Sequence, residues 1–234
     1  MDLKNKNILI TGGSLGIGKA TASLLVQSGA NVVITGRNKS RLEKAARETG
    51  AIPILADVAK QEDIELTYTQ FLDKFDHLDC LINNAGIGGR FSPIEDLKLE
   101  DLESVFSVNV FGAALMASKA AVLFKNQNYG HIINVGSTSA LKAGAKSTVY
   151  SASKFALRAM TQAWQAELRK YNVRVIQLNP SEVATAFGNI NREERKPADN
   201  KLSSQEIAYA VKAVLEMDDR GFIPELSVWA TNPW

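Results

Sequence analysis

Three side chains in the middle of the chain have the types and the spacing of a proton-transfer site. Ser137 follows an apolar run typical of a strand, and Tyr150 stands near the start of the next helical segment, four residues before Lys154. A spacing of four places the phenol and the ammonium one turn apart on one face of a helix. A free phenol has a pKa of about 10, and lowering it by ~3 units with a nearby cation requires about 4 kcal/mol. The trio therefore predicts a proton-transfer unit.

A glycine-rich turn near the N-terminus predicts a phosphate-binding loop. The segment TGGSLGIG at residues 11–18 follows the first apolar run and leads directly into a helical pattern. Its spacing is Gly12-x-x-x-Gly16-x-Gly18, which differs from the G-x-G-x-x-G fingerprint. Glycines at such a turn let the backbone approach a pyrophosphate at the helix N-terminus. The alternative is an ordinary glycine-rich turn, and its place between the first strand and the first helix favours the phosphate site.

The composition limits the class of protein. The chain has 234 residues, of which 45% are hydrophobic and 22% charged, and a net charge of +2. These values predict a globular domain with no strong field for nucleic acid or an anionic membrane. The longest apolar-looking stretch, residues 112–124, is broken by Lys119 and is shorter than a bilayer-spanning helix, and residues 1–6 lack a signal-peptide core. The single cysteine, Cys80, excludes an internal disulfide and favours a cytoplasmic location.

Alternating strand and helix patterns predict a single α/β domain built on a doubly wound parallel sheet. The expected strands are short and apolar, as in sheets covered on both faces; they span residues 7–11, 31–35, 51–56, 78–83, 131–135, 173–178 and, more weakly, 227–231. The expected helices span residues 18–28, 39–49, 61–75, 100–125, 149–171 and 203–217, the last with a capping-box spacing at its start. Ligands in such folds bind at the carboxyl ends of the strands.

These motifs together resemble the compact form of the short-chain dehydrogenase/reductase superfamily, one Rossmann domain without a separate substrate domain. The resemblance rests on TGGSLGIG, on NNAG at residues 83–86, and on Asn109, Ser137 and the Tyr150-x-x-x-Lys154 pair in the same order. It implies that Tyr150 is the general acid that protonates a carbonyl oxygen, and that Ser137 orients that oxygen. Lys154 is expected to lower the tyrosine pKa and to bind the nicotinamide ribose, while Asn109 holds a water that links Lys154 to solvent.

The resemblance also implies a nicotinamide dinucleotide and a set of residues around it. No metal site is expected. The expected cofactor contacts are Gly12, Ser14, Leu15, Gly16, Ile17, Gly18, Arg37, Asn38, Asp57, Val58, Asn84, Ala85, Gly86, Tyr150, Lys154, Pro180, Val183 and Thr185. Where the family usually has a glycine after the proline, this chain has Ser181, which leaves the local backbone open.

The end of the second expected strand favours NADP(H) over NAD(H). NAD-selective sites place a carboxylate there, which binds the ribose hydroxyls and repels a 2′-phosphate. This chain has Gly36-Arg37-Asn38 instead, and Arg37 stands where the resembled NADP-using members carry an arginine. A surface arginine without a ligand is the alternative.

The substrate is expected to be a small or medium carbonyl compound, such as a ketone or a 3-oxoacyl thioester. Ser137, Leu141, Lys142 and Phe187 are expected near it, and the loop of residues 186–201 is expected to set substrate choice. Two alternatives are an NAD-dependent alcohol dehydrogenase and a catalytically silent dinucleotide-binding redox regulator. Small and apolar residues around helices 100–125 and 149–171 predict a homodimer or homotetramer; they are Ala113, Ala114, Ala117, Ala121, Ala156, Ala159 and Ala163.

Overall fold

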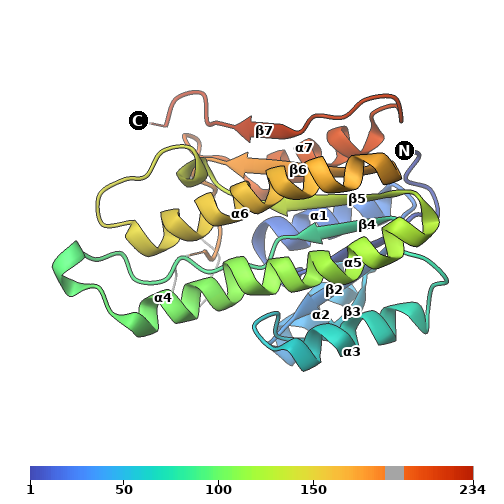
Figure 1. Ribbon diagram of the computed structural model, residues 1–234, viewed down its shortest axis with the longest axis horizontal. Coiled ribbons are helices and arrows are strands. Elements are labelled where there is room, and N and C mark those ends of the chain that lie inside the picture. The colour runs from blue at the N-terminus through green and yellow to red at the C-terminus, as the bar shows by residue number, and fades with distance from the viewer. Residues whose placement is uncertain (188–197, 234) are drawn as a thin grey trace.

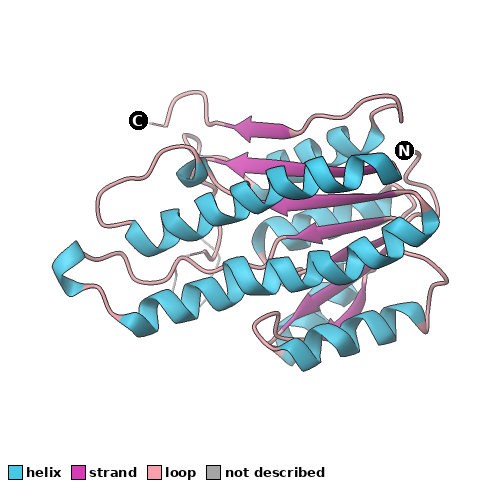
Figure 2. Ribbon diagram, in the orientation of Figure 1, coloured by secondary structure: helices cyan, strands magenta, loops and turns pink. Residues whose placement is uncertain are grey.

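A parallel sheet forms the centre of the protein in a computed structural model, which describes residues 1–187 and 198–233 (Figure 1). Among these residues seven strands pair in the order β3-β2-β1-β4-β5-β6-β7. They are β1 (Asn7–Ile10), β2 (Asn31–Gly36), β3 (Ile52–Leu55), β4 (Cys80–Asn83), β5 (Gly130–Val135), β6 (Val173–Pro180) and β7 (Glu225–Val228). Figure 2 shows that all of these arrows point the same way, so that their carboxyl ends share one edge.

Helices cover both faces of this sheet, as the alternating pattern predicts. One face packs against α1 (Gly16–Gln27), α2 (Lys39–Thr49) and α7 (Ser204–Glu216), and the other against α3 (Gln61–Leu72), α5 (Ala113–Gln127) and α6 (Thr148–Leu168). Neighbouring strand residues serve opposite faces: Ile8 and Ile10 join the first core, and Leu9 joins the second. The fold is therefore a single doubly wound α/β domain.

The strand order reverses between β1 and β4, which run side by side in the sheet. After β1 the chain continues into α1 on one face of the sheet. After β4 it leads to α5 on the other face. Loops that diverge in this way open a crevice above the sheet, where ligands of doubly wound folds bind.

The helix expected at residues 100–125 differs from the prediction in length and in regularity. It runs from Leu99 to Gln127 as α4 (Leu99–Phe106), a π-helical segment η2 (Ser107–Gly112) and α5. Its 29 residues are long and apolar enough to cross a membrane by those criteria alone, which the core helix of a soluble protein also meets. Half of its most apolar window is buried inside the fold. The apolar stretch at residues 112–124 is therefore only part of a helix that is longer than the sequence pattern indicated.

Other elements keep their predicted place with shifted ends. α1 begins at Gly16, α3 ends at Leu72, and α6 ends at Leu168 before a 3₁₀ turn, η4 (Arg169–Tyr171). The last strand begins two residues earlier than the predicted 227–231, because Glu225 pairs with Gln177 of β6 in the register. The capping box at α7 is confirmed: Ser203 accepts from the Glu206 amide, and the Glu206 carboxylate accepts from the Ser203 amide.

Candidate active site

A cavity of about 570 Å³ lies at the carboxyl edge of the sheet, over the point where the strand order reverses. Most of the predicted site residues line it: Gly12, Ser14, Leu15, Gly16, Ile17, Arg37, Asn38, Asp57, Val58, Asn84, Ala85, Gly86, Ser137, Tyr150, Lys154, Pro180, Val183, Thr185 and Phe187. Segments that follow six different strands thus meet at one place. Gly18, Asn109 and Leu141 are not among the lining residues.

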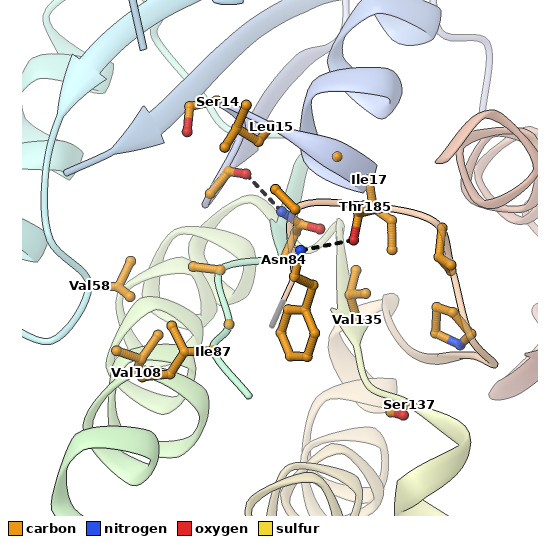
Figure 3. Close-up of a pocket in the computed structure, with 18 of the residues that line it drawn as sticks. Ser14, Leu15, Ile17, Val58, Asn84, Ile87, Val108, Val135, Ser137 and Thr185 are labelled. Atoms are coloured by element: carbon orange, nitrogen blue, oxygen red, sulfur yellow. Dashed lines mark hydrogen bonds between the residues drawn. The ribbon is translucent and has the colours of Figure 1, made fainter. Parts of the chain in front are cut away.

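The glycine-rich turn is held against the loop after β4. Gly12 adopts a φ of +67°, and a Cβ there would lie 2.8 Å from the Cα atom of Ala85. The Asn84 side-chain amide donates to the carbonyl oxygens of Thr11 and Gly12, at 2.9 and 3.0 Å; Figure 3 shows this side chain beneath the glycine-rich turn. A side chain at Gly18 would run into that amide. Gly18 therefore packs α1 against the turn and does not line the cavity.

The start of α1 is suited to an anion. Its N-cap residue, Leu15, makes no side-chain cap, and the first turn carries no acidic residue. The first amides of a helix lack partners within the helix and carry the positive end of its dipole. The helix start, which lines the cavity through Leu15, Gly16 and Ile17, therefore fits the pyrophosphate of a dinucleotide.

Basic residues line the cavity where β2 ends. Arg37 lines this end as predicted, and Arg41, in the first turn of α2, joins it. Ser14 lies next to Gly36, the residue before Arg37, since a Cβ on Gly36 would be 3.4 Å from the Ser14 hydroxyl. Asn38 caps α2 by accepting from the Arg41 amide at 3.0 Å, so its oxygen already has a partner. Sequence reasoning missed Arg41, although a basic residue in the first turn of the helix after β2 was a signal for it.

Asp57 shapes the turn after β3. Its side chain accepts from the Ala59 amide at 3.1 Å, and its own amide donates to the Asp63 carboxylate at 2.8 Å. Asp57 and Val58 nevertheless line the cavity. Asp57 therefore stabilises the turn before α3 without capping that helix, whose N-cap is Lys60, and it still lines the cavity.

Ser137, Tyr150 and Lys154 come together at the other end of the cavity. All three side chains line this end, and the Lys154 ammonium lies 5.8 Å from the centroid of the Tyr150 ring. Lys154 is 4% exposed and donates to the Val135 carbonyl at 2.9 Å. Figure 3 shows Val135 and Ser137 along one strand end, with Ser137 farthest from the glycine-rich turn.

The electrostatics of this trio differ from the sequence-based expectation. Burial raises the pKa of Tyr150, although the Ser137 hydrogen bond acts in the opposite direction. Burial also lowers the pKa of Lys154 to about 8, so its cation is itself destabilised. The expected lowering of the phenol pKa by Lys154 is therefore not present in the chain alone. At neutral pH the phenol keeps its proton, which is the form that a proton donor needs.

Asn109 lies in the π-helical segment and supports the loop after β4. Its amide oxygen accepts from the Ile87 amide, and its nitrogen donates to the Ile87 carbonyl, both at 2.9 Å. The same nitrogen also donates to the Ser153 hydroxyl at 3.1 Å. A Cβ on Gly86 would lie 3.4 Å from the Asn109 oxygen and 3.7 Å from the Lys154 nitrogen. Asn109 thus lies behind Gly86, close to the lysine but outside the cavity.

The segment after β6 is hydrogen-bonded to the end of the last strand through Ser181, which stands where the resembled family usually has a glycine. The Ser181 amide donates to the Val228 carbonyl at 2.8 Å, and its hydroxyl accepts from the Ala230 amide at 3.2 Å. The serine therefore replaces glycine without a left-handed backbone and adds a contact. Farther on, Thr185 is buried and accepts from the Phe187 amide at 3.2 Å. Residues 188–197 of the expected substrate loop lie outside the described residues.

Sequence reasoning missed several lining residues in addition to Arg41. They are Thr35, Gly36, Ala56, Ile87, Phe91, Val108, Val135, Gly136, Thr138, Ser139, Ser181 and Glu182, whereas Ala186 belongs to the expected substrate loop. Most adjoin predicted residues, so the strand-end rule could have found them. Phe91 had no such signal, because it stands in a loop eight residues beyond the end of β4.

Comparison with known proteins agrees with this arrangement. Residues 6–196 match the short chain dehydrogenase family. An uncharacterized oxidoreductase of Staphylococcus aureus strain MRSA252 is 34% identical over 230 residues, which covers 97% of each chain.

Solved structures with the same fold carry different nicotinamide cofactors. An alcohol dehydrogenase from Thermococcus sibiricus, complexed with 5-hydroxy-NADP, superposes with a TM-score of 0.89 at 29% identity and covers 97% of each chain. A 3-ketoacyl-(acyl-carrier-protein) reductase from Brucella melitensis, complexed with NADH, has the same TM-score and identity, over 99% of this chain and 100% of that one. From the family match, the relatives and the site, we conclude that the chain is an oxidoreductase and belongs to the short-chain dehydrogenase family.

Proposed function

We propose that this protein is an NADP(H)-dependent carbonyl reductase that converts a ketone or a 3-oxoacyl thioester to the alcohol. One observation carries the proposal: the Ser137–Tyr150–Lys154 cluster shares a single cavity with the glycine-rich turn and with Arg37 and Arg41. A proton-transfer unit and a dinucleotide cradle that face the same space are what a reductase needs.

The residues divide the work as follows. The hydroxyl groups of Ser137 and Tyr150 donate to the substrate carbonyl oxygen and hold it in one orientation. Bound nicotinamide would supply a hydride to the carbonyl carbon. As the carbon–oxygen π bond breaks, Tyr150 transfers its proton to the oxygen, so that the alcohol leaves with one new C–H and one new O–H bond. Lys154 stabilises the phenolate that remains.

The coenzyme preference follows from the cavity end near β2. Arg37, Arg41 and Ser14 supply two guanidinium groups and a hydroxyl, which suit the dianionic 2′-phosphate of NADP(H). β2 itself ends at Gly36 without a carboxylate that would repel this phosphate. These groups favour NADP(H) over the alternative of an NAD-dependent alcohol dehydrogenase.

The retained catalytic side chains favour an enzyme over a silent redox regulator. A regulator needs only the cradle, whereas this chain also buries a lysine beside the phenol at a cost in folding free energy. We further propose a reducing, cytoplasmic location, because the one cysteine, Cys80, is a buried thiol within β4.

The test is a panel of carbonyl compounds followed by the absorbance of NADPH, with Tyr150→Phe as the decisive variant. We expect oxidation of NADPH by the unmodified protein and a loss of turnover of ~10² or more in the variant, since only the proton donor is removed. NADPH affinity, measured by fluorescence titration, should stay within about threefold, because the ring is retained.

Tyr209→Phe provides the matched control. Tyr209 is 60% exposed on α7 and does not line the cavity, so this variant should match the unmodified protein. Near-normal turnover in Tyr150→Phe would overturn the mechanism. NADPH binding without turnover of any carbonyl would favour the regulator instead.

A further inference from the structure

Two phenyl rings flank the phenol of Tyr150. Phe91, from the loop after β4, has its centroid 6.0 Å from that of Tyr150 and its plane tilted by 47°. Phe187, from the segment after β6, lies at 5.5 Å with a tilt of 56°. Both rings line the cavity. Aromatic rings attract one another over such distances in tilted arrangements, so the proton donor lies within an aromatic wall.

The two rings converge from separate segments onto one point. A Cβ on Gly88 would lie 3.2 Å from Phe187 Cε1 and 3.5 Å from Phe91 Cε2. Glycine at position 88 therefore leaves the space into which both rings fit. A Cβ at this position would require the Phe187 ring to shift by a few tenths of an ångström.

The backbone that carries each ring is held in place. On one side of Phe91, Ile87 is bound through both its amide and its carbonyl by Asn109. On the other side, the Ser92 amide donates to the Lys146 carbonyl at 3.1 Å. The Phe187 amide donates to the hydroxyl of the buried Thr185. The rings therefore belong to a built part of the cavity.

Covering the Phe91 side chain with an apolar group is favourable in free energy. Its side chain is 53% exposed, and removing apolar surface from water is favourable by roughly 25 cal/mol per Å². A substrate ring placed against it would remove that exposure next to the reacting hydroxyl.

Among the described lining residues, no charged side chain next to the Phe91 and Phe187 rings is without a partner. Its charged members are Arg37, Arg41, Asp57, Lys154 and Glu182. The first three follow β2 and β3, at the far end of the cavity. Lys154 donates to the Val135 carbonyl, and Glu182 is paired with Lys201 at 2.8 Å. These residues favour an uncharged substrate over one with a carboxylate or ammonium group next to the reacting carbon.

We propose that Phe91 and Phe187 form an aromatic clamp that selects uncharged ketones with an aromatic ring attached to the carbonyl carbon. This inference rests on the proposed carbonyl reduction at Tyr150. The clamp holds the substrate ring, which brings the carbonyl oxygen to the Tyr150 and Ser137 hydroxyls. The reaction balances as above: the carbonyl carbon gains a hydride from NADPH, and the oxygen gains the phenol proton.

The test compares two ketones of nearly equal size, acetophenone and cyclohexyl methyl ketone, which differ in the aromaticity of the ring. We expect Phe91→Leu and Phe187→Leu each to lower kcat/KM for acetophenone about 2- to 10-fold more than for cyclohexyl methyl ketone. Comparing the change in this ratio between proteins cancels the intrinsic reactivity of each ketone. Phe222→Leu is the matched control, since Phe222 is half-buried, contacts Arg169 and does not line the cavity.

A binding measurement separates the clamp from the proposed function. Calorimetry of both ketones with the protein in NADP⁺, where no reduction occurs, should show tighter binding of acetophenone and loss of that preference in the two variants. If no carbonyl is reduced while this preference holds, the proposed reaction fails and the clamp stands. If ketones are reduced but neither variant changes the acetophenone ratio, the clamp is wrong and the reductase stands.

Discussion

Lys154 occupies a position that opposes folding at neutral pH. Burial lowers the pKa of its ammonium from an ordinary value of 10.5 to about 8. Below pH 8 the group is protonated in the folded and unfolded states alike, so folding bears the full cost of burying the charge. Between pH 8 and 10.5 the folded state releases the proton first, and the cost disappears as the pH rises. The difference in pKa corresponds to about 3 kcal/mol.

We therefore expect Lys154→Met to stabilise the protein at pH 7 while it abolishes reduction. The net gain in unfolding free energy should be about 2 kcal/mol, because the Val135 carbonyl loses its donor. Urea denaturation at pH 7 and pH 10 measures it, and the gain should shrink at the higher pH. Lys44→Met, at a lysine whose side chain is 71% exposed, should show no gain. An unfolding free energy below that of the unmodified protein at both pH values would contradict this account.

Arg37 and Arg41 permit a direct test of coenzyme choice. Arg37→Ala should raise the NADPH dissociation constant roughly tenfold and leave that of NADH nearly unchanged, since a charge-assisted hydrogen bond contributes about 1.5–3 kcal/mol. The low end applies because Arg41, which lines the same end of the cavity, remains to bind the phosphate in this variant. Arg41→Ala should act in the same direction, whereas Arg47→Ala, exposed at the far end of α2 and away from the cavity, should have no effect. Tighter binding of NADH than NADPH by the unmodified protein would reject the assignment.

Among individual residues, sequence patterns predict the catalytic side chains better than the residues that surround them. The Tyr150–Lys154 spacing places both side chains on one helix face whatever the rest of the fold does. Phe91 contacts Tyr150 through a loop whose Ser92 amide is bonded to the Lys146 carbonyl before α6, and local patterns do not encode this pairing. The pKa of Tyr150 likewise depends on burial by distant segments, so the sign of its shift could not be predicted from Lys154 alone.

A chain of buried polar side chains crosses the sheet below the site. The Asn83 amide donates to Asn134, Asn134 donates to the Thr161 hydroxyl, and that hydroxyl lies 2.8 Å from the Gln177 oxygen. From there Gln177 donates to Asn179, and Asn179 donates to Glu225, which also accepts from Arg158; the chain thereby joins β4, β5, α6, β6 and β7. A buried network of this kind contributes only while each member keeps its partner.

Thr161→Val tests this network because the side chain keeps its shape and loses only the hydroxyl. We expect a loss of roughly 2–3 kcal/mol in unfolding free energy by urea denaturation, since Asn134 and Gln177 are left with unpaired buried groups. Thr67→Val is the matched control: Thr67 is equally buried, and its hydroxyl donates at 2.7 Å to the Asp63 carbonyl of its own helix. That variant should lose about 1 kcal/mol or less. Equal losses would show that the network adds nothing beyond single bonds.

The elements that the sequence predicted well are those with strong local signals, such as the apolar strands and the Ser203–Glu206 capping box. The shift of β7 has a tertiary cause, because Glu225 can enter the sheet only where Asn179 and Arg158 satisfy its carboxylate. The π-helical segment η2 also has a tertiary cause. Its extra residue lets Asn109 face Ile87 and Ser153 at once, and no propensity of residues 107–112 announces it.

The exposed faces of α5 and α6 support assembly into a homodimer or homotetramer, which we propose for the whole molecule. Phe111 at the start of this face and Leu115 and Val122 on α5 are 57%, 40% and 58% exposed at near-helical spacing, and Phe155 on α6 is 41% exposed. Of the alanines expected at an interface, Ala159 and Ala163 are exposed, whereas Ala113 and Ala117 are buried against the sheet. An apolar face of this kind is typical of contacts between copies.

Light scattering should therefore give at least twice the monomer mass at micromolar concentration. Leu115→Lys should shift the protein toward the monomer with its circular dichroism unchanged, because a charge is desolvated in the interface. Leu66→Lys, at a 49% exposed leucine of α3, should leave the mass as it is. A monomer mass for the unmodified protein would reject the interface.

The outer strand β3 determines how the sheet meets other molecules at high concentration. The Ala56 amide donates inward to the Gly36 carbonyl of β2, and strand amides alternate in direction, so the backbone nitrogen at position 53 faces outward. That residue is Pro53, which has no N–H to offer. An extended peptide or a second sheet that approached this edge would meet no N–H donor at position 53 of the four-residue strand. Edge-to-edge strand addition is thereby disfavoured on this side of the protein.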